Sequence, residues 1–205
     1  MTKNRKPPQK ANVLEQLSKP HLYSIRKTYF IHANRYLSEK QVKKIFGACE
    51  KAFQTGTPLN RFFTIHYNDH ADPKRPQEFV NYILERSRKW LTYRGIPTAY
   101  AYVIENGKTK GIHLHLLIHI PPNFQREYKR ALARWLPFEW SRKRVDTKTI
   151  SYPHYGELSP LDGVYGVLRY MCKGVNPATP VYGIKPKYQG EVFGQRWGVS
   201  KSLRE

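Results

Sequence analysis

Cysteine is scarce in this sequence. Cys49 and Cys172 are the only two in 205 residues, and neither belongs to a Cys-x-x-Cys pair. A disulfide framework needs more cysteines, and a structural zinc site needs them at closer spacing. The composition therefore argues against both and favours a reducing compartment.

Long apolar runs and acidic residues are also scarce. No segment approaches the roughly 20 consecutive apolar residues that span a membrane, so we expect no membrane segment. Only 15 Asp and Glu stand against 36 Lys and Arg, which gives a net charge of +21, and 14% of residues are aromatic. Basic side chains release counterions from nucleic acids, and aromatic rings stack on unpaired bases. A nucleic acid is therefore a more natural partner than a membrane surface.

The length predicts one main domain with extensions. Residues 1–12 are basic, polar and proline-containing, and we expect them to form a disordered arm. Residues 13–58 form an N-terminal helical extension, residues 59–174 hold the main domain, and residues 175–205 form a basic, aromatic tail.

Hydrophobic periodicity and turn residues predict the elements of the chain. The expected helices cover 37–53, with Ser38 and Gln41 as a capping box, and 76–93, 123–136 and 161–174. The expected strands cover 59–69, 98–120 as a hairpin, and 144–152. This order predicts an α+β fold of the ferredoxin-like or RRM-like kind: an antiparallel sheet with helices on one face and the other face open for a ligand.

The hairpin holds the densest group of metal-ligand residues. His113 and His115 alternate with apolar residues, so they point to the same face of a strand. If the turn is centred near Thr109, Glu105 lies opposite His113 on that face. Two imidazoles and one carboxylate then meet at one point, as a catalytic metal site requires. The alternative is a surface strand that carries histidines by chance, and His119 is interpreted in that way.

A second group lies in the helix expected over 161–174. Tyr170 and Lys173 are three residues apart, so they share one helix face. A tyrosine can attack phosphorus, and a nearby ammonium can stabilise the phenolate or the phosphate oxygens. Without the hairpin, Tyr170 would be taken for a packed aromatic residue. Tyr165 lies about 140° around the helix from it, and we expect it to have a packing role.

Together these features resemble the HUH endonucleases, in particular the rolling-circle replication initiators (Rep proteins). The similarity rests on HLH at 113–115, a Glu eight residues upstream, YMCK at 170–173 and, more loosely, the aromatic strand RFFTIHY at 61–67. It implies a metal-dependent nick in single-stranded DNA. Glu105, His113 and His115 would hold Mg²⁺ or Mn²⁺, and Tyr170, assisted by Lys173, would form a 5′-phosphotyrosine. An incoming 3′-hydroxyl could then reseal the strand.

The resemblance also implies partners. Origin DNA, as a single strand or a hairpin, would be the substrate, and replication machinery would follow in a bacterial cytoplasm, with the gene on a plasmid, phage or mobile element. No Gly-x-x-x-x-Gly-Lys-Ser/Thr loop occurs, so a separate helicase would unwind the duplex. His66, Arg196 and Lys201 are candidate DNA contacts, and the tail either adds a strand to the sheet or lies along the DNA.

Several other functions remain open at this point. A transposase or relaxase of the same superfamily would use similar residues. A non-haem iron oxygenase also uses two histidines and a carboxylate, although it gives no role to the charge or to Tyr170. A non-catalytic RRM-like module would bind nucleic acid on its open sheet face.

Overall fold

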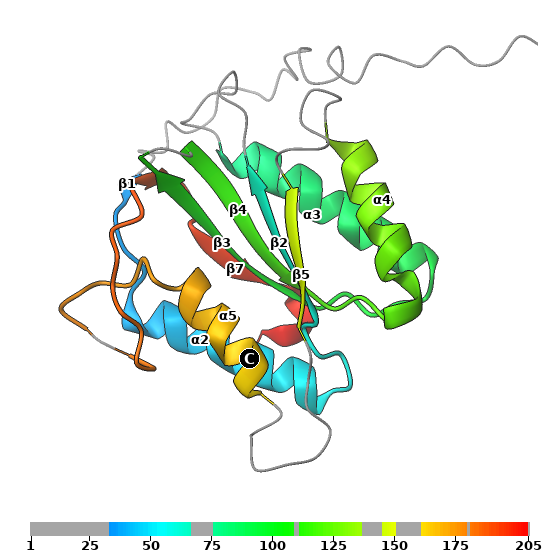
Figure 1. Ribbon diagram of the computed structural model, residues 1–205, viewed down its shortest axis with the longest axis horizontal. Helices are drawn as coiled ribbons and strands as arrows, with labels where there is room; N and C mark the ends of the chain where they lie inside the picture. Colours follow the sequence, from blue (N-terminus) through cyan, green and yellow to red (C-terminus); the bar gives the residue numbers. More distant parts are fainter. Residues whose placement is uncertain are drawn as a thin grey trace, which may run out of the picture. The chain divides into compact units, whose positions relative to one another are not determined.

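Five strands form the sheet at the centre of the structure (Figure 1). The computed structural model describes residues 33–66, 76–108, 111–136, 145–150, 161–179 and 181–204. The predicted arm at 1–12 and the start of the N-terminal extension lie outside the described residues. The strands of this sheet are β2 (Arg61–His66), β3 (Tyr100–Gly107), β4 (Gly111–Ile118), β5 (Val145–Thr149) and β7 (Trp197–Val199).

The strand order is β5-β2-β4-β3-β7, and each neighbouring pair is antiparallel. The first four strands, with α3 (Pro76–Tyr93) and α4 (Gln125–Trp135), follow the chain order strand, helix, strand, strand, helix, strand. This is the order that the sequence predicts for a ferredoxin-like core. The α+β class and the antiparallel sheet are therefore confirmed.

Helices cover both faces of this sheet, whereas the sequence predicts helices on one face. The helices α3 and α4 share a buried cluster with one set of alternating strand residues, which includes Phe63, Ile104 and Leu116. The helices α2 (Glu39–Gln54) and α5 (Asp162–Met171) share a second cluster with the other set, which includes Val103 and Leu117. Both strand faces are apolar along most of their length, so each needs a helical layer. Among the described residues the sheet leaves no broad open face for a ligand.

The helix α2 begins as its sequence predicts. The Ser38 hydroxyl accepts a hydrogen bond from the Gln41 amide at 3.3 Å, and the Gln41 side chain accepts one from the Ser38 amide at 2.9 Å. This capping box satisfies two amides that the first turn of a helix leaves without partners. The buried stripe of α2 includes Ile45, Phe46 and Cys49, which pack in the same cluster as α5.

The tail returns to the sheet and extends it. The strand β7 pairs with the edge of β3, and β6 (Val192–Phe193) pairs with the short strand β1 (Ala33–Asn34). The remaining short elements are two 3₁₀ turns, η1 (Pro122–Phe124) and η3 (Lys201–Leu203). The prediction that the tail packs as an extra strand is therefore confirmed. None of the described helices has both the length and the apolar composition that a membrane crossing requires.

Candidate metal centre and nucleophile

The β3–β4 hairpin brings the three predicted metal ligands together. Glu105 pairs directly with His113 across the ladder, and Gly107 pairs with Gly111, which centres the turn where the sequence predicts it. Oε2 of Glu105 lies 3.0 Å from Nε2 of His113 and 3.1 Å from Nε2 of His115. One ligand atom from each of the three residues falls within 4.8 Å of the other two. The side chains of Glu105, His113 and His115 are therefore close enough to bind one ion.

The second nitrogen of each imidazole is held by a neighbouring group. Nδ1 of His113 donates to the carbonyl of Gly111 at 3.0 Å, and Nδ1 of His115 pairs with the Thr64 hydroxyl at 3.1 Å. A neutral imidazole that donates from Nδ1 keeps its lone pair on Nε2. The lone pair of His113 is therefore directed toward the Glu105 carboxylate, and a cation between them would relieve the contact of two acceptors.

Burial and charge set the protonation states of the centre. Glu105 and His115 are almost completely buried. Burial alone would raise the pKa of Glu105, but hydrogen bonds from His113, His115 and Lys173 outweigh it and hold the pKa well below its usual range. Burial lowers the pKa of His115 to about 4, against the opposing effect of Glu105. Near neutral pH the site therefore offers a carboxylate and a neutral imidazole, which are the forms that bind metals.

Two buried atoms of this centre lack hydrogen-bond partners among the described residues. They are Oε1 of Glu105 and Nε2 of His115. His115 Nε2 lies near Glu105 Oε2, but the bond angle is unsuitable for a hydrogen bond. Buried polar atoms without partners are costly, and a metal ion would satisfy both. The residues present therefore fit a divalent cation, although they do not fix its identity.

The helix α5 places Tyr170 and Lys173 beside this centre. The Tyr170 ring lies 5.3 Å from the His115 ring and is half exposed, while Lys173 Nζ lies 2.9 Å from Oε2 of Glu105. Lys173 Nζ also lies 3.8 Å from the centre of the Tyr170 ring. The apolar side of α5 packs on α2 and the sheet. A solvent-accessible phenol, an ammonium and the three candidate metal ligands therefore meet at one place.

Tyr165, the other tyrosine of α5, is directed elsewhere. Its hydroxyl donates to Oε1 of Glu50 on α2 at 2.6 Å, and its ring lies 5.5 Å from that of Phe46. Burial and the hydrogen bond to Glu50 raise its pKa above the usual value for tyrosine. These contacts agree with the packing role that the sequence suggests.

The three candidate DNA contacts have different fates. His66 pairs with His113 in the β2–β4 ladder, and the two rings lie 5.5 Å apart, so His66 borders the metal centre. Lys201 is exposed but follows Ser200, whose amide bonds to the Tyr100 carbonyl at the other end of β3 from Glu105. It stays a prediction, at a distance from the site.

Arg196 corrects an expectation. It is 2% exposed, and its guanidinium donates to the backbone carbonyls of Asn34, Arg35, Gln189 and Gly190. Burial is the main cause that lowers its pKa. Its donors are therefore directed into the fold, where they join the tail to β1, and Arg196 is not a surface contact for DNA phosphates.

His119 stays outside the metal centre, as the sequence suggests. Its Nδ1 donates to the carbonyl of Pro58 at 2.8 Å. The sequence interpretation missed two other residues of β2. Thr64 holds His115, and the Phe62 ring lies 5.5 Å from His115 and 6.2 Å from Tyr170. Both share the alternating face of His66, but only the pairing of β2 with β4 reveals which side chains they meet.

Comparison with known protein families agrees with this site. Residues 60–174, more than half of the chain, match the model of a family of replication-associated proteins, described by its member ORF2. The chain belongs to this family. No curated protein and no solved structure matches the chain significantly.

The match to the replication-associated family covers the whole candidate centre. It begins just before β2 and ends at Gly174, one residue after Lys173, so it contains Glu105, His113, His115 and Tyr170. Membership of a replication-associated family agrees with the resemblance to rolling-circle initiators and with the buried Glu–His–His cluster. The helix α2 and the tail lie outside the matched range.

Proposed function

We propose that this protein is a rolling-circle replication initiator that nicks and rejoins single-stranded DNA through Tyr170. The observation that carries the proposal is the position of α5, which brings an accessible tyrosine and a lysine against the Glu105–His113–His115 cluster. The replication-associated family and the net charge of +21 support a DNA substrate.

The cleavage step follows from the chemistry of these groups. The Tyr170 hydroxyl loses its proton and its oxygen attacks the scissile phosphorus. The bond from phosphorus to the 3′ oxygen breaks, that oxygen takes up a proton, and the 5′ side of the strand remains as a phosphotyrosine. Lys173, which lies against both the Tyr170 ring and Glu105, stabilises the negative charge that develops on the phenolate and the phosphate. Attack by an incoming 3′-hydroxyl reverses the step and joins two strands.

A divalent cation would be held by Glu105, His113 and His115. When bound, it would act as a Lewis acid toward the phosphate oxygens. Magnesium prefers oxygen ligands, whereas manganese binds mixed sites with imidazole more readily. We therefore expect Mn²⁺ to bind more tightly than Mg²⁺, while either ion would serve the reaction.

The cellular setting follows from the same proposal. Only Tyr170 is placed as a nucleophile, so one strand is held at a time, and a separate helicase opens the duplex. The substrate is origin DNA presented as a single strand or a hairpin. The protein works with the replication machinery in a bacterial cytoplasm, and its gene belongs to a plasmid, a phage or a mobile element.

The decisive experiment is a nicking screen with Mn²⁺ and origin-derived oligonucleotides. The wild-type protein should form a covalent DNA adduct that survives denaturing electrophoresis. Tyr170→Phe should lose it completely, because the ring stays but the attacking oxygen is removed. Tyr165→Phe is the matched control on the same helix and should keep the adduct.

The opposite pattern, an adduct lost in Tyr165→Phe and kept in Tyr170→Phe, would show that the nucleophile is misassigned. Product analysis separates a transposase from an initiator, since an initiator leaves strands that are extended and circularised. Cleavage with Mn²⁺ in the absence of oxygen excludes an iron oxygenase. A non-catalytic binding module would form no adduct with any oligonucleotide.

A further inference from the structure

Three exposed tyrosines lie outside both the candidate centre and the matched family range. Tyr36, Tyr182 and Tyr188 are 39%, 40% and 48% exposed. Exposed aromatic rings are uncommon on a surface rich in charge, and nucleic acids use such rings as stacking platforms. The three rings are not needed for the proposed chemistry at Tyr170.

Tyr36 and Tyr188 form one aromatic unit from segments far apart in the chain. Their ring centres lie 5.7 Å apart at an angle of 61°. Tyr36 precedes α2, and the backbone next to it is fixed, because the Leu37 amide donates to the Gly174 carbonyl at 2.9 Å. The pair is therefore held in place although both rings reach solvent.

Tyr182 is held in an unusual backbone conformation. It has a φ of 52°, and it is the one residue other than glycine with a positive φ in the described part of the chain. The Ile184 amide donates to the Val181 carbonyl at 3.1 Å, which closes a tight turn around Tyr182 and Gly183. Such a turn favours glycine or asparagine, so a tyrosine here costs about 1 kcal/mol and suggests a function for the ring.

The contacts of Tyr182 explain how this conformation persists. Its ring is parallel to that of Phe46, with centres 4.0 Å apart and an interplanar angle of 1°. Its carbonyl accepts a hydrogen bond from Nε of Arg169 at 2.9 Å. One ring face is thus covered by Phe46 while the residue stays 40% exposed. This arrangement presents a flat aromatic surface to solvent.

Both aromatic units are tied to the helix that carries Tyr170. Arg169, which holds Tyr182, directly precedes Tyr170 in the chain. The amide of Lys187, which precedes Tyr188, donates to the carbonyl of Lys173 at 2.7 Å. The exposed rings therefore belong to segments that border the candidate nucleophile.

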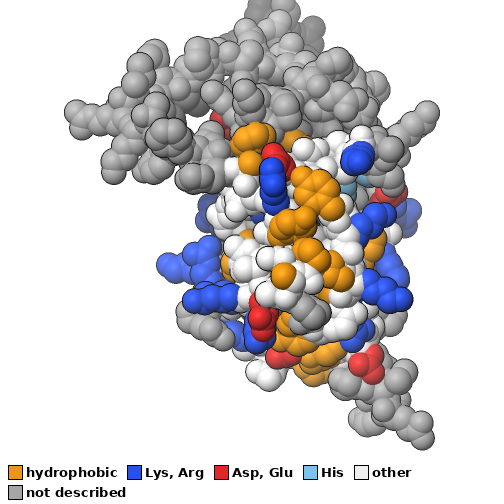
Figure 2. All heavy atoms as spheres, turned by 90° about the vertical axis from the view of Figure 1, so that its left-hand side faces the viewer, with side chains coloured by type: hydrophobic (Ala, Val, Ile, Leu, Met, Phe, Trp, Pro, Cys, Tyr) orange, Lys and Arg blue, Asp and Glu red, His pale blue; other side chains and the backbone are white. Residues whose placement is uncertain are grey.

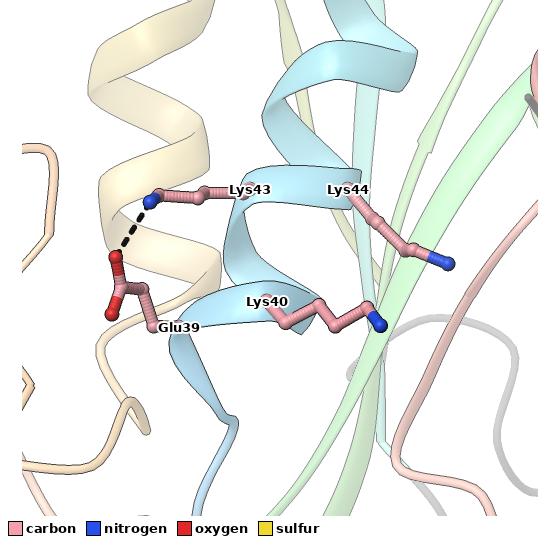
Figure 3. Close-up of a pocket in the computed structure, with 4 residues that line it drawn as sticks. All are labelled: Glu39, Lys40, Lys43 and Lys44. Carbon is pink, nitrogen blue, oxygen red and sulfur yellow. Dashed lines mark ion pairs between the residues drawn. The ribbon is translucent and has the colours of Figure 1, made fainter.

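Lysines of α2 add positive charge beside these rings. Lys40, Lys43 and Lys44 line a shallow hollow with Glu39, which pairs with Lys43 at 2.6 Å (Figure 3). In Figure 3, Lys40 and Lys44 extend away from this pair with no acidic group drawn near them. Lys43 lies close enough to the Tyr182 hydroxyl for the two groups to interact electrostatically.

The same character is visible across one side of the molecule. Figure 2 shows the face that is on the left of Figure 1, where the orange segment after α5 lies, and hydrophobic side chains form a column on it. Lys and Arg side chains flank this column on both sides. Apolar rings between rows of cations are typical of a track for a single-stranded nucleic acid, which needs bases stacked and phosphates neutralised.

We propose that Tyr36, Tyr182 and Tyr188, with Lys40, Lys43 and Lys44, form an accessory subsite that binds the single strand leading away from the nick. This inference rests on the proposed function for the identity of the strand. The segment before residue 33 is a poor alternative occupant, because it carries seven Lys and Arg and one acidic residue. Its charge has the same sign as that of the lysines.

Binding of the oligonucleotide dT30 without a divalent cation tests this subsite independently of nicking. Base stacking on one ring contributes about 5- to 100-fold in affinity, so Tyr36→Ala/Tyr188→Ala should weaken binding of dT30 by at least about 10-fold. Tyr36→Phe/Tyr188→Phe keeps the rings and should bind like the wild type. Tyr93→Ala is the matched control, because Tyr93 is 87% exposed but lies on α3.

The lysines are tested by the salt dependence of the same binding. Each phosphate contact contributes about 0.7 to the slope of log affinity against log salt for a single strand, so replacing Lys40, Lys43 and Lys44 with Gln should reduce the slope by about 2. Lys89→Gln is the control, because Lys89 is exposed on α3 and pairs with Glu85 as Lys43 pairs with Glu39. It should leave the slope unchanged.

The subsite is disproved if the alanine variant binds dT30 like the wild type, or if Tyr93→Ala weakens binding equally. Circular dichroism must show that each variant is folded. Tyr188→Ala alone, which removes only the more exposed ring of the pair, serves if the double variant unfolds. Because dT30 is bound without cleavage, failure here leaves the nicking proposal intact, and a protein that nicks nothing can still show the subsite.

Discussion

Thr64 orients a metal ligand that belongs to another strand. Its hydroxyl lies 3.1 Å from Nδ1 of His115, and both residues are paired in the β2–β4 ladder. A group that holds the far nitrogen of a ligand imidazole fixes the ring and directs its other lone pair to the metal. Thr64 is therefore a positioning residue for the centre rather than a ligand.

Replacing Thr64 with Val should weaken metal binding while the fold is kept. Val has nearly the same shape but lacks the hydroxyl, so the His115 ring loses its fixed orientation. Loss of such a partner typically costs about 10- to 100-fold in metal affinity. Titration calorimetry with Mn²⁺ measures this loss directly. Thr147→Val is the control, because Thr147 pairs with Phe63 and so lies on the opposite face of the sheet.

Equal Mn²⁺ affinity in Thr64→Val and the wild type would show that His115 is oriented by packing alone. The Phe62 ring, 5.5 Å from that of His115, would then be the next candidate. The expected loss should appear without a shift in the unfolding midpoint larger than that of the control.

At the residue scale the sequence predicted the ligands but not their supports. Glu105, His113 and His115 lie within one hairpin, so the period of two and the position of the turn were enough to bring them together. Thr64 and Phe62 come from a strand that pairs with β4 across about 50 residues of chain. Such pairing depends on the whole sheet, and no local pattern contains it.

At the scale of elements, the tail depends on a close approach between backbones. Gly190 has a φ of 71°, and a Cβ added there would lie 1.9 Å from the carbonyl oxygen of Asn106 on β3. The Asn106 amide donates to the Gln189 carbonyl at 2.8 Å, so the contact is part of how the tail is fixed. Gly194 has a φ of 81° but no atom within 4 Å of an added Cβ.

These two glycines separate backbone strain from a steric clash. Gly194→Ala should cost about 1 kcal/mol in the free energy of unfolding, because only the left-handed conformation is penalised. Gly190→Ala has the same penalty and must also move the tail away from β3, so it should cost about 2 kcal/mol more. Urea unfolding followed by circular dichroism measures both. Equal losses would mean that the tail moves away from Asn106 without cost.

Long elements were predicted well and short ones were not. The helix α3 has the predicted bounds, and α2 has the predicted capping box, because each carries several turns of apolar periodicity and a clear terminal signal. The strands β1, β6 and β7 have two or three residues each, which is too short for a period to be detected. Arg196 was misinterpreted for the same reason, since its partners are carbonyls of these short segments.

At the scale of the whole molecule, one sheet serves two helical layers. The layer of α2 and α5 covers the face that carries the metal centre, and the layer of α3 and α4 covers the other face. The nucleophile and its supports thus belong to a layer that adds to the ferredoxin-like core. Charge of one sign over the chain attracts DNA, but the packed layers limit where a strand can reach the centre.

Cys49 and Cys172 provide a probe of whether the layer of α2 and α5 opens on its own. Both thiols are 0% exposed in the cluster of that layer. Burial, and then the charge of Glu105, raise the pKa of the Cys172 thiol above its usual value, so little thiolate exists in the native state. Because the layer shares the sheet with α3 and α4, we expect one cooperative transition.

A disulfide reagent such as DTNB should therefore react with neither thiol in the native protein at pH 8. In rising urea, the midpoint of thiol reaction should coincide with the midpoint of the loss of circular dichroism. Stability should also fall as the pH rises above about 9, because the unfolded chain can ionise Cys172 while the native state keeps it protonated. Cys172→Ser, compared with Cys49→Ser, should reduce that alkaline loss. Thiol reaction at a urea concentration below the circular dichroism midpoint would instead show that the layer carrying Tyr170 opens before the core unfolds.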